Sequence, residues 1–75
     1  MNDFAEALIR DEEWLRRSAE LRKIRHRIPE LDVLATHDVR WARKARLLRI
    51  EEAQLARDLV ALAGRIQRRL YRGDN

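Results

Sequence analysis

Apolar residues recur at a helical period along the first third of the chain. One side of a helix would hold Ala7, Leu8, Trp14, Leu15, Leu21, Ile24 and Ile28. Such spacing predicts an amphipathic helix. Asp3 and Glu6 fit a capping box at its start, and Pro29 is disfavoured in a helix interior. We therefore expect a helix over residues 4–28 and a short helical connector over residues 29–35.

A longer apolar seam follows the proline. Its positions alternate between spacings of three and four residues: Leu31, Leu34, Asp38, Trp41, Ala45, Leu48, Glu52, Leu55, Leu59, Leu62 and Ile66. This spacing is typical of helices that pack as in a coiled coil. Residues 36–39 are poor helix formers, and Thr36 or Asp38 could cap a new helix, so we expect a second helix over residues 37–71. One unbroken helix from Pro29 to Tyr71 is the alternative.

These elements predict an all-α protein. Residues 1–75 should form a single domain, an antiparallel helical hairpin whose connector is kinked at Pro29, with a frayed tail over residues 72–75. The chain has two glycines and one proline, which leaves little room for the turns that a sheet protein needs.

The small size of the chain indicates self-association. A core built from 75 residues barely offsets the entropy of ordering the chain, and without cysteine no disulfide can help. A second apolar strip beside the seam, with several alanines, indicates contact with more than one neighbour. Helix-forming alanines on a solvated surface are the alternative. We expect an antiparallel dimer, which would form a four-helix bundle, or a larger bundle. The association would involve Leu55, Ala56, Leu59, Val60, Leu62, Ala63, Ile66 and Leu70.

Charged residues alternate in blocks along the chain, whose net charge is +4 with fifteen arginines and two lysines. Residues 16–28 carry six bases and one acid, residues 29–38 three acids, and residues 39–50 five bases and no acid. If the chain folds back near Pro29, the two basic blocks meet. We expect one basic band made of Arg22, Lys23, Arg25, Arg27, Arg40, Arg43, Lys44, Arg46 and Arg49. Screening by solvent and salt could also make this a merely tolerated surface.

An anionic partner is the functional interpretation of this band. Nucleic-acid phosphates, an acidic protein surface and an anionic membrane surface all offer the required charge. Trp41 lies among arginines and could stack on a base, although its place on the seam is more typical of a core residue. The preferred function is a non-catalytic interaction or assembly module that docks on a protein partner. A nucleic-acid-binding regulator is the alternative.

The sequence lacks catalytic and metal-binding patterns. Ser18 has no histidine at helical spacing, and no glycine-rich phosphate loop occurs. His26, His37 and Asp38 could meet across a turn, but no HxxxH or ExxH spacing supports a metal site. We expect no enzymatic activity, no cofactor and no metal. The longest apolar run is too short for a membrane span, and the acidic start lacks a secretory signal, so we expect a cytoplasmic protein.

Overall fold

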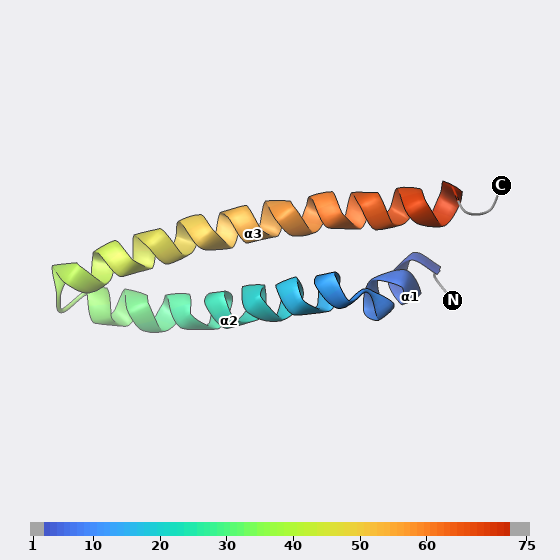
Figure 1. Cartoon of the computed structure of the whole chain (residues 1–75). Coiled ribbons are helices and arrows are strands. Elements are labelled where there is room, and N and C mark those ends of the chain that lie inside the picture. The colour runs from blue at the N-terminus through green and yellow to red at the C-terminus, as the bar shows by residue number, and fades with distance from the viewer. Residues whose placement is uncertain (1–2, 73–75) are drawn as a thin grey trace.

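Helices account for nearly all of residues 3–72, the part of the chain that this computed structural model describes (Figure 1). Helix α1 covers Asp3–Arg10, α2 covers Glu12–Ala35 and α3 covers Val39–Arg72. Residues 3–72 contain no strand, which confirms the predicted all-α class. Arg72 is still helical, and the remainder of the expected frayed tail, residues 73–75, lies outside the described range.

Asp11 divides the expected first helix into two. Its backbone is extended, with φ −85° and ψ 115°, and its carboxylate accepts a hydrogen bond from the Trp14 amide at 2.9 Å. This is the geometry of an N-cap, a position that aspartate prefers strongly. The acids Glu12 and Glu13 then occupy the first turn of α2, where the helix dipole favours them. The prediction of one unbroken helix over 4–28 was therefore wrong at this residue.

Pro29 does not end the helix. Helix α2 passes through it and continues to Ala35, so the expected boundary at residue 28 and the separate connector over 29–35 are absent. A proline inside a helix costs about 3 kcal/mol because it removes one hydrogen bond and crowds the preceding turn. Burial of Leu31, worth roughly 1.5–3 kcal/mol, and partial burial of Ile28 offset that cost.

The chain reverses direction over residues 36–38. The Asp38 amide donates a hydrogen bond to the Leu34 carbonyl oxygen at 3.1 Å. The Asp38 carboxylate in turn accepts from the Arg40 amide at 2.9 Å, so Asp38 caps α3. Of the two predicted caps, Thr36 and Asp38, the aspartate therefore starts the new helix. This turn also excludes the alternative of one unbroken helix after Pro29.

Helices α2 and α3 lie side by side and run in opposite directions, and α1 lies beside the C-terminal part of α3 (Figure 1). The buried side chains line these contacts: Leu21 and Leu31 from α2, and Ala45, Leu59, Leu62 and Ile66 from α3. All but Leu21 belong to the predicted seam, and Leu21 belongs to the predicted first apolar stripe. The seam is thus the core of this structure.

The molecule is long and thin. Its dimensions are 58 × 18 × 16 Å, and its radius of gyration is 16.5 Å, against about 11 Å for a compact domain of this length. Within residues 3–72, no helix is both long and apolar enough to cross a bilayer. A single layer of helices therefore leaves most side chains at the surface.

Replacing Pro29 with alanine tests the continuity of α2. Because the proline lies inside a helix, Pro29→Ala should raise the free energy of unfolding by about 1–3 kcal/mol. Urea denaturation followed by circular dichroism measures the change. The exposed neighbour Glu30 is the control, and Glu30→Ala should stay within about 0.5 kcal/mol of the unchanged chain. No gain in stability for Pro29→Ala would instead indicate a helix boundary at residue 29.

Candidate interaction surfaces

All nine residues of the predicted basic band are exposed. They lie on two helices that turn their apolar sides toward each other, and Arg25 and Arg49 each pair with an acid of the opposite helix. Two open hollows among them are each lined by a single helix, one on α2 and one on α3. The basic residues therefore surround the end of the molecule where the chain turns, and a single continuous band stays a prediction.

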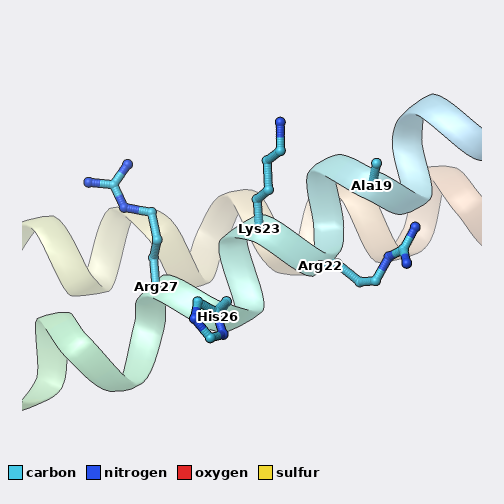
Figure 2. Close-up of a pocket in the computed structure, with 5 residues that line it drawn as sticks. All are labelled: Ala19, Arg22, Lys23, His26 and Arg27. Carbon is cyan, nitrogen blue, oxygen red and sulfur yellow. The ribbon is translucent and has the colours of Figure 1, made fainter.

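The basic face of α2 points away from α3. Figure 2 shows its lining residues on the near side of α2, with α3 behind: Ala19, Arg22, Lys23, His26 and Arg27. Their spacing of three and four residues places them opposite the buried Leu21. The cationic side chains diverge around the small Ala19 rather than meeting at one point. This geometry suits an extended anionic surface better than a single small anion.

The basic face of α3 differs in chemistry, because large aliphatic side chains are interspersed among its cations. Its hollow is lined by Val39, Arg40, Ala42, Arg43, Lys44, Arg46 and Leu47. Val39 is 81% exposed and Leu47 is 58% exposed. The sequence-based prediction included the cations of this face but not its aliphatic residues. The sequence pattern does contain this face, because positions 39, 43, 46 and 50 repeat at helical spacing on the side opposite the seam. All four residues are exposed in the structure.

Acidic residues at the edge of the α2–α3 contact separate the two basic blocks. Arg25 of α2 binds Glu52 of α3 at 3.6 Å. Arg49 of α3 binds Asp32 of α2 at 2.5 Å. Each exposed pair contributes only about 0.2–1 kcal/mol, yet each also places a negative charge where cations from both helices approach. The fold therefore brings basic blocks together without bringing unscreened cations into contact.

A third cross-helix pair lies farther from the turn. Arg17 of α2 lies 3.4 Å from Asp58 of α3 and 3.0 Å from Glu13 on its own helix. The spacing of four residues indicates the pair of Glu13 with Arg17, but nothing in the sequence pattern indicated Asp58 as the second partner. Spacing within one helix cannot reveal a partner on another helix whose register is unknown.

Asp38 and Arg40 form a local unit at the start of α3. The Arg40 guanidinium, at 2.9 Å, and the Arg40 amide both hydrogen-bond to the carboxylate and hold the pKa of Asp38 below its usual 3.8. One of the five basic residues of α3 near the turn is thus engaged by the helix cap.

Trp41 is half-buried on the seam and is not a free stacking platform. The Lys44 ammonium lies 4.8 Å from the centre of its ring, a cation–π distance. A nucleic-acid base would have to displace this lysine from the ring. The contact supports the core interpretation of Trp41 over the base-stacking one.

The predicted self-association residues divide into two groups. Leu59, Leu62 and Ile66 are buried within the single chain, which removes them from the surface open to a partner. Val60 is 73% exposed. The remaining members are partly exposed: Leu55, Ala56, Ala63 and Leu70.

Neither histidine lies in a metal-binding cluster. Within residues 3–72, no group of three or more His, Cys, Asp or Glu side chains could hold a metal ion. His26 is exposed on the basic face of α2, and His37 is exposed in the turn. A metal site made of His26, His37 and Asp38 thus finds no support in the geometry.

Comparisons with known proteins assign no role to these surfaces. No family model, no curated protein and no solved structure matches the chain. What these surfaces can bind must therefore be inferred from the geometry and charge of residues 3–72.

Neutralising the two acids at the helix contact tests their role between the basic blocks. At low salt, Asp32→Asn combined with Glu52→Gln should lower the free energy of unfolding by about 0.5–2 kcal/mol. The loss should shrink as sodium chloride screens the released cations. Urea denaturation at several salt concentrations measures it. Glu51→Gln removes an exposed acid for which residues 3–72 provide no ion pair, and it should cost less. Equal losses for both variants would contradict this role.

The lowered pKa of Asp38 predicts a pH dependence of stability. Because the folded pKa lies below the unfolded value, the ionised carboxylate stabilises the fold above about pH 3.8, and this contribution is lost as the pH falls through the folded pKa. An asparagine side chain at this position would still cap the helix, so Asp38→Asn should lose less stability than the unchanged chain on acidification below pH 4. Thermal unfolding from pH 6 to pH 2 compares the two. Parallel curves would contradict the prediction.

Proposed function

We propose that this chain is a non-catalytic assembly module. In this proposal it acts as an antiparallel helical hairpin that dimerises along one side of α3. The dimer presents the basic faces near the turn to an anionic surface on a protein partner. Other molecules would bind on the outer faces of the helices rather than in an enclosed cavity.

The excess of exposed surface is the observation that carries this proposal. The chain exposes 6208 Å². A compact monomer of 9.0 kDa exposes about 4,900 Å². A standard protein interface removes roughly 800 Å² from each partner. A dimer of ordinary size would therefore cover more than half of this excess.

The side of α3 around Val60 is the best-supported contact. Ala56 and Ala63 lie one turn before and one turn after Val60, and these small side chains would let a second helix approach closely. Gly64 adds a second argument. A Cβ at this position would meet only the Arg68 side chain, at an ordinary 3.7 Å, so packing within the chain does not require glycine. Glycine in a helix interior costs about 1 kcal/mol relative to alanine, and close approach of a partner helix would account for that cost.

Charge favours antiparallel copies in the dimer. Residues 22–49 hold nine basic and three acidic residues, so the turn end of the molecule is strongly positive. The molecule is 58 Å long, and screening acts over about 8 Å at physiological salt. In an antiparallel dimer the two positive turn ends would lie too far apart to repel each other. In a parallel dimer they would lie side by side.

Nucleic-acid binding is a second candidate function, and the α2 face favours it. Arg22, Lys23 and Arg27 are exposed there without a large aliphatic neighbour in their hollow. Nucleic-acid phosphates bind exposed cations such as these and gain little from exposed apolar side chains. A gel shift with single-stranded and duplex oligonucleotides tests this candidate, and binding through the α2 face should weaken when Arg22, Lys23 and Arg27 are neutralised.

Substitution of Val60 tests self-association. Light scattering of the unchanged chain should give twice the 9.0 kDa chain mass. Val60→Glu places a charge in the proposed contact and should give the single-chain mass with unchanged helicity, because Val60 is exposed within one chain. Ala61→Glu is the matched control, since Ala61 is exposed one residue away and should leave the dimer intact.

A single-chain mass for the unchanged protein at every concentration would overturn the proposal. A dimer that survives Val60→Glu would show that the contact lies elsewhere.

A further inference from the structure

The side of α3 that faces away from α2 carries a stripe of exposed arginines. Its arginines are unevenly spaced along the helix and are all exposed: Arg43, Arg46, Arg57, Arg65, Arg68 and Arg72. At 1.5 Å per residue, they extend over about 44 Å of helix. Helices α1 and α2 both lie along one side of α3, and within residues 3–72 no helix lies along its opposite side (Figure 1).

The acids of α3 do not neutralise the stripe. Glu52 and Asp58 bind arginines of α2. Glu51 lines a hollow together with Glu20 and Ile24 of α2, so it also faces the contact between the helices. Among residues 3–72, none of the six stripe arginines has an acidic partner within ion-pair distance. Glu51 and Asp58 precede Arg65 by fourteen and seven residues and so share its heptad position. The part of the outer side around Arg43, Arg46 and Arg57 therefore presents positive charge alone.

Large aliphatic side chains lie among the first of these arginines. Val39 is 81% exposed, Leu47 58% and Ile50 59%. They fall on the same side of α3 as Arg43 and Arg46, at spacings of three and four residues. A partner that matches this face must therefore combine anionic groups with an apolar region that can bury the aliphatic side chains.

We propose that the outer side of α3 binds the surface of an anionic phospholipid bilayer. Helix α3 lies flat, its arginines bind lipid phosphates, and Val39, Leu47 and Ile50 enter the boundary between headgroups and acyl chains. The arginine stems extend along the apolar boundary while their guanidinium groups stay at the phosphates. This inference assigns the basic face of α3 to lipid and leaves that of α2 to the protein partner, and it does not depend on dimerisation.

Two observations favour a bilayer over other anionic partners. The phosphates of a nucleic acid would leave the three aliphatic side chains exposed, and Trp41, the aromatic residue nearest to them, is half-buried under Lys44. An acidic protein would need carboxylates matched to arginines whose spacing is irregular, at 3, 11, 8, 3 and 4 residues. Lipid headgroups diffuse and adapt to any spacing. A fluid anionic surface therefore matches the face most directly.

Vesicle binding by the full chain tests the proposal. The probes are vesicles of phosphatidylcholine with phosphatidylglycerol and vesicles of phosphatidylcholine alone, measured by co-sedimentation. The unchanged chain should bind the anionic vesicles, with affinity that falls as salt rises, and bind the neutral ones at least tenfold more weakly.

Two pairs of matched variants locate the binding face. Arg43→Gln, Arg46→Gln and Arg57→Gln together should weaken binding on the order of 100-fold. The control triple removes three positive charges from the α2 face, at Arg22, Lys23 and Arg27, and should weaken binding less than tenfold. Ile50→Gln should weaken binding roughly fivefold to tenfold. The control Val33→Gln changes an aliphatic residue that is 63% exposed on α2 and should have no such effect. Circular dichroism confirms that each variant keeps its helices.

Three results would overturn the proposal. The first is failure to bind anionic vesicles at low salt. The second is equal loss from the two triple variants, which would mean that net charge alone drives binding. The third is tighter binding to a single-stranded or duplex oligonucleotide, measured by gel shift, that requires the same arginines and is unaffected by Ile50→Gln. That last result would assign the face to nucleic acid.

Discussion

Everything in this structure depends on one narrow contact between two long antiparallel helices. The side chains buried along it are few and mostly aliphatic, with Leu62 the most completely enclosed. A contact one helix wide cannot cover the other sides of α2 or α3, so the chain stays elongated and exposes more surface than a compact protein of its mass. A partner would therefore bind to the outer faces of the helices, and the side chains on those faces decide which partners are suitable.

Ion pairs place negative charge at the contact between the helices and positive charge on their outer faces. Asp32, Glu52 and Asp58 project toward the neighbouring helix and bind its arginines. Individually such exposed pairs stabilise the fold only slightly. Collectively they move negative charge to the inner edges of the helices and leave positive charge outside. The cost of placing basic blocks side by side is thereby reduced, and the same arrangement leaves both outer faces basic.

The sequence pattern predicted the core better than the helix ends. Leu31, Leu59 and Leu62 follow the heptad spacing, because packing against one neighbour imposes that period on the chain. The positions of the helix ends depend on free-energy contributions that nearly cancel. Pro29 looked like a boundary by its local cost, but burial of Leu31 and partial burial of Ile28 offset that cost, and only tertiary packing reveals this contribution. Asp11 was not recognised as a cap because apolar spacing on both sides suggested one helix.

The surfaces were harder to predict because the register between helices decides them. Charge blocks along the sequence indicated basic residues near the turn, but spacing within one helix could not reveal the cross-helix pairs Arg25–Glu52 and Arg49–Asp32. Leu59 and Ile66 were assigned to self-association, although the seam position that made them attractive is also what buries them inside one chain. Val60, just beside the seam, escapes that burial. Arg57 lies three residues before Val60, and the Arg68 side chain lies against Gly64, so self-association along this side would cover part of the arginine stripe. Arg43 and Arg46, nearer the turn, would stay open, and two linked copies would bind a shared surface through them more tightly than one.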